Sequence, residues 1–444
     1  MRPRSITGPL ILVAIGVIFL LNNLGHDLPL WSLFWDYWPV LLIVIGVVGL
    51  VEVLFHVSRG SDIPPRPLAG GGWFWILIVM FALWGSNKGN WHIGRLNTGS
   101  VNILGSDYEY DVNAASPSQG ITRIVLDNIH GNLSLKGEDV TEIKVTGHKS
   151  VRAFNKTDAD RGNEQSQIKV ERQGDLLFIR ADEPHNARML SISADLDVTV
   201  PKGIDIEARG RNGDLTIEDV NGSVDVTSGR GDVRLTDIGK DVKIESTRTG
   251  LVRATGIRGN LDLQGRGSEV QLEKIDGQVT INGEYGGTLE FRELAKPLRF
   301  NSQRTDFRVE RVPGSITLDL GELKMNSVVG PVRFQTGVRD IQATDVTDAL
   351  ELTVDRGDIQ VTETKTPLPR MEIHSRNGDI TLSIPEKASF ELDGRTGQGE
   401  AANDFGPPLE NHSEGRAATL KGRVGNGPKL TLSTERGSLT VKKN

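Results

Sequence analysis

We predict that this 444-residue chain is an all-β solenoid of short stacked strands, preceded by an α-helical transmembrane region. Two observations lead to this prediction. From about residue 120 onward, short apolar alternations bounded by turns recur, and at about residues 211–384 they have a period of about 18 residues, which is the signature of a repeat architecture. Before residue 95, apolar runs approach the roughly 20 residues that a helix needs to cross a bilayer. Helical periodicity is absent after residue 120, apart from a short segment at Lys156–Gln165.

The N-terminal segment is expected to begin with a two-helix transmembrane hairpin at residues 1–57. Residues 8–24 carry no charge, residues 38–57 carry one glutamate, and an aromatic-rich loop joins them. A secretory signal peptide would end after one such run, so two helices are the simpler interpretation. The stretches FLLNNLG and WPVLLIVIGVVGL resemble the LiaI/LiaF-like transmembrane region of bacterial envelope-stress proteins. That resemblance implies a bacterial membrane anchor.

Residues 58–85 are predicted to hold a loop and a third, short transmembrane segment at residues 72–85. This run is shorter than a typical spanning helix, so two alternatives stand: it crosses the bilayer, or it lies in the interface. Crossing is favoured because Trp73, Trp75 and Trp84 bracket its apolar middle, as interfacial anchors do.

Four basic residues set the expected orientation. Arg2 and Arg4 precede the first apolar run, and Arg59 and Arg66 lie between the second and the third. The positive-inside bias places the N-terminus and the second loop in the cytoplasm. If the third segment crosses, the protein is a multi-pass protein of the bacterial cytoplasmic (inner) membrane, and its C-terminal domain is extracytoplasmic.

Residues 86–120 are expected to be a polar linker and residues 121–444 the β-solenoid, with regular coils at about 211–384. Two turns recur in each coil. One contains a corner hydrophobe, at Val220, Ile238, Ile257, Ile275, Leu294, Val312, Val328 and Val346. The other contains glycine, often followed by aspartate, at the structural turn positions Gly213, Asp214, Gly231, Asp232, Gly250, Gly267, Gly357, Asp358, Gly378 and Asp379. Positive φ angles would explain the glycines, and Asx-type bonding would explain the aspartates.

Stacking explains why such short strands can be stable. A strand of four or five residues cannot bury its apolar face alone, but coils stacked about 4.8 Å apart pair each backbone with the next. The inward residues then form aliphatic ladders, and the outward residues, largely Asp, Thr, Arg, Lys and Glu, face water. A two-layer and a triangular cross-section are both compatible with the period.

Three stretches carry a second family resemblance: IVLDNIHGNLSLKG, LDVTVPKGIDIEARGRNGDLTIEDVNGSVDVTSGRGDV and KLTLSTERGSLTVKK. They resemble the bacterial putative-adhesin domain of β-solenoid type, a family of unknown function, over about residues 121–443. The resemblance implies a β-rich module at the cell surface or in the periplasm.

The sequence offers no residues for catalysis, a cofactor or a metal ion. The chain has no cysteine, and no two of its histidines have ligand spacing. Regular Gly-Asp turns explain both Arg-Gly-Asp tripeptides, at residues 230–232 and 356–358, without a role in cell attachment. The formal net charge of −7 argues against a nucleic-acid partner.

The leading hypothesis is a non-enzymatic, membrane-anchored cell-envelope protein that uses its solenoid for binding, adhesion or envelope-stress sensing. Its expected partners are the lipid bilayer and either another envelope protein or a cell-wall glycan. Two alternatives stay open. A scaffold could polymerise through unpaired solenoid ends, and a carbohydrate-active β-helix would use paired carboxylates as acid and base.

Overall fold

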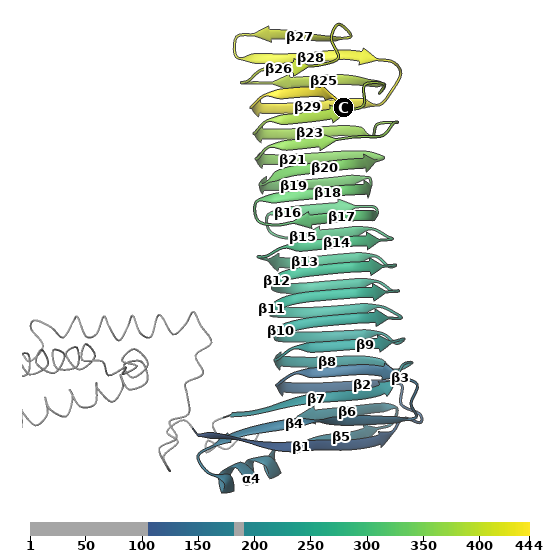
Figure 1. Ribbon diagram of the computed structural model, residues 1–444, viewed down its shortest axis with the longest axis vertical. Coiled ribbons are helices and arrows are strands. Elements are labelled where there is room, and N and C mark those ends of the chain that lie inside the picture. The colour runs from purple at the N-terminus through teal and green to yellow at the C-terminus, as the bar shows by residue number, and fades with distance from the viewer. Residues whose placement is uncertain (1–104, 182–190) are drawn as a thin grey trace, which may run out of the picture. The chain divides into compact units, whose positions relative to one another are not determined.

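The computed structural model describes residues 105–181 and 191–444, which all belong to the unit Thr98–Asn444. This part of the chain is a β-solenoid, as predicted, and its strands form two stacked layers (Figure 1). A two-layer cross-section is therefore the correct alternative. The three predicted transmembrane segments lie outside the described residues. Within the described residues, no helix combines the length and the apolar character that crossing a membrane requires.

Each coil contributes one strand to each layer. β8 (Asp205–Asn212) lies in layer I, and after a glycine corner the chain continues as β9 (Leu215–Val220) in layer II. In the next three coils one bent strand runs through both layers: β10 (Val224–Ile238), β11 (Val242–Ile257) and β12 (Leu261–Ile275). These coils pair in parallel, so Val226, Ile244 and Leu263 occupy equivalent positions.

The two layers extend the same pairing in both directions. In addition to β8 and the first halves of β10 to β12, layer I contains β5 (Ile168–Gln173), β6 (Leu176–Ala181), β2 (Arg123–His130), β13 (Val279–Tyr285), β15 (Leu298–Asn301), β16 (Thr305–Val309), β19 (Val332–Val338), β21 (Ala349–Arg356), β23 (Arg370–Asn377), β29 (Lys429–Arg436), β25 (Phe390–Thr396), β28 (Ala417–Val424) and β27 (Leu409–Glu414). In addition to β9 and the second halves of β10 to β12, layer II contains β1 (Ser106–Pro117), β4 (Glu142–Ala153), β7 (Ser191–Pro201), β3 (Leu133–Glu138), β14 (Leu289–Leu294), β17 (Val312–Leu318), β18 (Glu322–Val329), β20 (Asp340–Thr347), β22 (Ile359–Thr362), β24 (Ile380–Ile384), β30 (Leu439–Lys443) and β26 (Ala401–Asn403).

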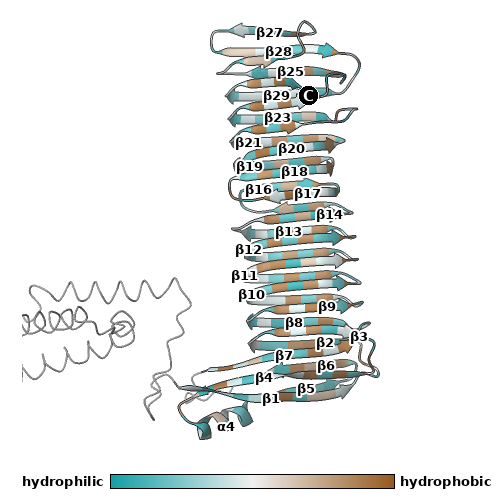
Figure 2. Ribbon diagram, in the orientation of Figure 1, coloured by the Kyte–Doolittle hydropathy of each residue, from teal (hydrophilic) through white to brown (hydrophobic). Residues whose placement is uncertain are grey.

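The core between the layers consists of aliphatic ladders. Inward apolar residues alternate with outward polar ones along each strand, which gives the brown and teal stripes of Figure 2. Ile244, Ile257 and Leu263 have no exposed surface. Burial of one such side chain stabilises the fold by about 1.5–3 kcal/mol. Because the same position recurs in every coil, no strand needs to be stable alone.

One coil runs against the others. β16 is antiparallel to β15 and β19, and β17 is antiparallel to β14 and β18, so the coil formed by β16 and β17 is reversed. Regular winding resumes when β18 pairs in parallel with β20. The regular coils expected over about 211–384 are thus interrupted. Aromatic rings fill the core here, because Phe300, Phe307 and Phe334 are in cross-strand register.

Strands that the repeat does not predict close the N-terminal end. β1 pairs antiparallel with β4 over its whole length of 12 residues. It falls within the expected linker at residues 86–120, so that expectation is wrong for this stretch: alternating residues give the strand a half-buried face. The predicted short helix is confirmed as α4 (Lys156–Gln165), where the side chain of Asn155 accepts a hydrogen bond from the Asp158 N–H at 2.8 Å.

The chain terminus is not the end of the solenoid. After β24, the chain makes β25 to β28 and then returns, so that β29 and β30 pair in parallel with β23 and β24. β25 then pairs with β29, and β28 and β27 follow outward. Figure 1 accordingly shows the C-terminus below β25, β28 and β27.

Candidate functional site

The predicted glycine corner is a column of tightly stacked backbones. Gly213, Gly231, Gly357 and Gly378 have φ angles of 139°, 116°, 143° and 157°. A Cβ atom on Gly231 would lie 2.1 Å from the carbonyl oxygen of Gly213, and one on Gly378 would lie 2.0 Å from that of Gly357. Both the backbone angle and the close approach of the preceding coil therefore exclude a side chain.

Gly267 lies in register with Gly231 through Thr249, whereas Gly250 is one residue beyond that register. They are part of the continuous strands β11 and β12, and neither has a positive φ. A Cβ on Gly250 would lie 2.5 Å from Oδ1 of Asp232, and one on Gly267 would lie 2.6 Å from Oγ1 of Thr249. At these two positions, neighbouring side chains exclude a Cβ atom, and the backbone angle does not.

The corner aspartates bind the next coil, whereas an Asx turn would bond within its own turn. Asp214 Oδ1 accepts a hydrogen bond from the N–H of Asp232 at 2.9 Å, and Asp358 Oδ1 accepts from the N–H of Asp379 at 2.9 Å. Asp232 and Asp379 accept from the next backbone N–H groups at 2.9 and 2.7 Å. This arrangement runs from Asn132 to Leu251 and again from Asp340 to Ser438, and it satisfies backbone donors where the strands break. The predicted turn residues thus form an inter-coil hydrogen-bond ladder.

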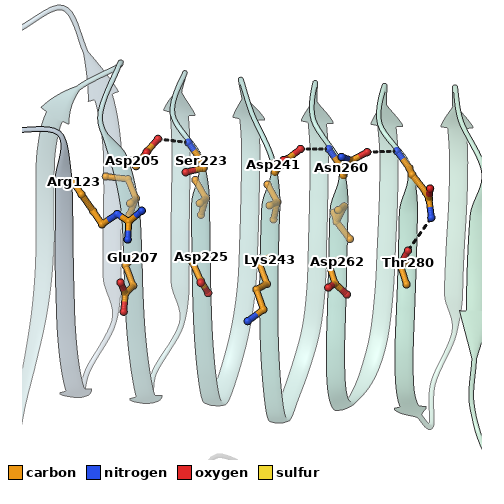
Figure 3. Close-up of a pocket in the computed structure, with 15 residues that line it drawn as sticks. Arg123, Asp205, Glu207, Ser223, Asp225, Asp241, Lys243, Asn260, Asp262 and Thr280 are labelled. Atoms are coloured by element: carbon orange, nitrogen blue, oxygen red, sulfur yellow. Dashed lines mark hydrogen bonds between the residues drawn. The ribbon is translucent and has the colours of Figure 1, made fainter.

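A shallow depression of about 510 Å³ lies on the outer face of layer I, over β2, β8 and β10 to β13. Figure 3 shows its upper rim, where Asp205 Oδ1 accepts from the N–H of Ser223 at 2.8 Å and Asp241 Oδ1 accepts from the N–H of Asn260 at 2.7 Å. Asn260 continues this ladder to the next coil. The rim acids are therefore occupied by structural hydrogen bonds.

The lower row of the depression contains three carboxylates and one lysine. Glu207, Asp225, Lys243 and Asp262 follow one another in cross-strand register, as Figure 3 shows. Burial raises the pKa of Asp225, with Lys243 opposing the shift and Glu207 adding to it. In the described part of the chain, no group of three or more His, Cys, Asp or Glu side chains could hold a metal ion.

A second outer surface differs because it is uncharged. On layer II, two columns of polar side chains cross β20, β22 and β24, and we call them the neutral array: Gln342, Gln360 and Thr381 in one column, and Thr344, Thr362 and Ser383 in the other. Their side chains make no hydrogen bond with any other described residue. A charge-free array of unused donors and acceptors is a feature that the sequence reading missed, although the outward residues of QAT, QVT and TLS could have shown it.

A buried carboxyl group lies at the corner after β22. Glu363 is 2% exposed, and burial raises its pKa to about 8, a shift that the hydrogen bond from the N–H of Val346 opposes. That bond is 3.1 Å long and ends on Oε1 of Glu363. The group faces a backbone corner rather than an open cavity, so its role here is structural.

Two family models match the chain. Residues 121–442 match the family described as Toastrack DUF4097, and residues 6–50 match the LiaI-LiaF-like transmembrane region. No curated protein matches the chain.

Several solved structures are similar to the chain at low sequence identity. A putative cell adhesion protein from Clostridium sporogenes is 9% identical, with 76% of this chain and 100% of that chain covered and a TM-score of 0.18. A putative lipid binding protein from Parabacteroides distasonis is 10% identical, with coverages of 78% and 98% and a TM-score of 0.22. The family match extends over well more than half of the sequence. The chain therefore belongs to the Toastrack DUF4097 family, and a LiaI-LiaF-like transmembrane region makes it a bacterial membrane-associated protein.

Proposed function

We propose that the protein is a non-enzymatic cell-envelope protein that presents its solenoid outside the cytoplasm and binds an uncharged envelope glycan. The matched transmembrane region supports a membrane anchor. The basic residues before the first apolar run and in the second loop support a cytoplasmic N-terminus. In this proposal, residues 1–57 form the hairpin, residues 58–85 hold the third span, and the solenoid follows it.

The neutral array is the observation that carries the binding proposal. Each column has one residue on each of three adjacent strands, and the two columns lie two residues apart along those strands. Hydroxyl and amide groups therefore repeat about every 4.8 Å across the strands and about 6.6 Å along them. Such groups can each donate and accept, as the hydroxyl groups of a neutral sugar do. Lys324 and Lys442 flank the array in register, and the array itself has no charge. A neutral, hydroxyl-rich polymer matches this surface better than an ionic ligand.

A binding experiment with charge insertion tests the proposal. Full-length protein in neutral detergent micelles is mixed with insoluble cell-wall glycan and sedimented. Gln360→Glu with Thr362→Glu should reduce the bound fraction at least tenfold. The two carboxylates hold water strongly, and they would then lie against the hydroxyl groups of the ligand. Thr353→Glu with Gln335→Glu places the same charges on the outer face of layer I, where β19 and β21 pair, and should bind as the parent does. Equal binding by all three proteins contradicts the proposal.

The same experiment addresses the enzyme alternative. Soluble sugar released from the glycan during incubation would indicate a carbohydrate-active solenoid. The occupied corner acids and the shallow, open depression favour an unchanged polymer.

A further inference from the structure

A column of three arginines lies along one edge of the solenoid. Arg230 and Arg248 are in direct parallel register. Arg266 lies on the next coil between Gly265 and Gly267, at a register shift where Thr247 and Arg248 both face this one residue. All three side chains are exposed. None of them has a hydrogen bond or ion pair with any other described residue.

The carboxylates beside this column are already engaged. Asp214 and Asp232 both pair with Arg234, at 3.1 and 2.5 Å, in addition to their inter-coil hydrogen bonds. Glu284 is the register neighbour of Arg266, and its Oε1 accepts from the N–H of Gln303 at 2.7 Å. These carboxylates keep their charge, but none of the three forms an ion pair with a guanidinium group of the column.

Like charges in cross-strand register destabilise a sheet. Here Arg230 and Arg248 are one strand spacing of about 4.8 Å apart, and Arg266 lies on the next coil, so the three coils that carry them span about 10 Å along the stacking direction. An anion with several charges in a line would relieve the repulsion.

We propose that the arginine column binds a linear polyanion whose repeating charges are phosphodiesters. The planar guanidinium group forms paired hydrogen bonds with phosphate oxygens, and it keeps its charge at all relevant pH values. The column is one residue wide and follows the stacking axis, so it fits a single polymer strand better than a flat membrane surface. Asn212, in register with Arg230, and Glu284, in register with Arg266, bound the column at its two ends.

This inference does not rest on the neutral array. The array lies on the outer face of layer II between β20 and β24, whereas the arginines lie at the glycine corner of β10, β11 and β12. Loss of one binding activity therefore leaves the other intact.

The test measures the affinity of full-length protein in neutral detergent for a fluorescent poly(glycerol phosphate) oligomer at about 50 mM salt. The triple variant Arg230→Gln, Arg248→Gln, Arg266→Gln should bind at least tenfold more weakly, and the affinity of the parent should fall steeply with salt. The matched control is Arg299→Gln, Arg308→Gln, Arg333→Gln. It removes the same charge from three exposed arginines in register on the outer face of layer I. Two of these have carboxylate partners, Arg308 with Asp306 at 3.2 Å and Arg333 with Glu351 at 3.4 Å, so this variant should bind as the parent does.

Equal losses in the two triple variants would overturn the proposal, because only overall charge would then matter. Unchanged binding by the column variant would overturn it as well. Vesicles of phosphatidylglycerol provide the second arm. Column-dependent binding to vesicles without binding to the oligomer would show a lipid surface as the partner and contradict the assignment to a linear polymer. Thermal midpoints of all variants confirm that each is folded.

Discussion

At the scale of single residues, the glycine column sets how closely coils approach. Gly231→Ala would place a Cβ 2.1 Å from the Gly213 carbonyl oxygen at a φ of 116°, so the two coils must separate. We expect the free energy of unfolding to fall by about 2 kcal/mol or more, which a lower thermal unfolding midpoint would show. Gly286→Ala is the control, because its added Cβ meets nothing within 4 Å. Similar midpoints for the two variants would contradict the close packing at this corner.

The buried carboxyl of Glu363 should make stability depend on pH. Its folded pKa of about 8 lies above the ordinary value of 4.5, so the folded state holds a proton that the unfolded state releases between these two pH values. The stability that this bound proton gives to the folded state is fully present below pH 4.5. It is lost as the pH rises to 8, by at most about 1.4 kcal/mol per pH unit. Glu363→Gln keeps an acceptor for Val346 but cannot ionise.

Thermal unfolding measured from pH 5 to pH 8 tests this assignment. The midpoint of the parent should fall more steeply with rising pH than that of Glu363→Gln. The exposed residue Glu372 provides the control, since Glu372→Gln should preserve the slope of the parent. Parallel curves for the parent and the Glu363 variant would show that this carboxyl is ionised in the folded state.

At the scale of the strand and its corner, a left-handed residue precedes most corner hydrophobes. The described positions are Asp219, Asp237, Gly256, Lys274, Glu293, Ser327 and Asp345, with φ angles between 51° and 73°. This residue interrupts the alternation, so that the next hydrophobe also points inward. A side chain in this region costs about 1–2 kcal/mol.

Exchange of Lys274 tests the role of this corner. Lys274→Gly should be at least as stable as the parent and clearly more stable than Lys274→Val, because a β-branched residue fits a φ of 56° poorly. At Thr255, an outward position within β11, the order should reverse, since valine suits a strand better than glycine. The thermal unfolding midpoints of the glycine and valine variants at both positions test this expectation. The same order of glycine and valine at the two positions would contradict the corner assignment.

The sequence predicts those elements that depend on local pattern. Apolar alternation and turn residues identify the strands between β8 and β14, because each coil repeats the same inward positions. The reversal at β16 and β17 escapes this reasoning, since Phe307 and Val309 alternate equally well in either chain direction. Two signals were present: the glycine-aspartate turn is missing after Asn301, and the spacing from Val312 to Val328 is shorter than the others.

The proposed binding surfaces were less predictable than the strands. Glycines and aspartates of the corner are visible in the sequence, but their inter-coil bonds depend on the stacking of residues about 18 positions apart. The neutral array and the arginine column likewise form only when outward residues of successive coils come into register. Long-range register is the information that a local pattern does not contain.

At the scale of the whole molecule, the additional strands at each end of the stack bear on self-association. β27 is the outermost strand of layer I at one end, and five of its six residues are exposed. Its charged side chains, including Glu410 and Glu414, disfavour pairing with another copy, as edge charges do in natural sheets. Polymerisation through the ends is therefore a weaker hypothesis than ligand binding along the sides.

Every functional proposal depends on the side of the membrane on which the solenoid lies. The chain contains no cysteine, so a single introduced thiol reports its own location. Leu320 is 71% exposed on the solenoid, and Leu320→Cys should leave the fold intact. Ser61→Cys lies in the loop that is expected to be cytoplasmic.

The most direct measurement treats cells stripped of their walls with a maleimide that cannot cross the membrane, before and after lysis. We predict that Leu320→Cys is labelled in intact cells and that Ser61→Cys is labelled only after lysis. Labelling of Leu320→Cys only after lysis would place the solenoid in the cytoplasm and contradict both binding proposals.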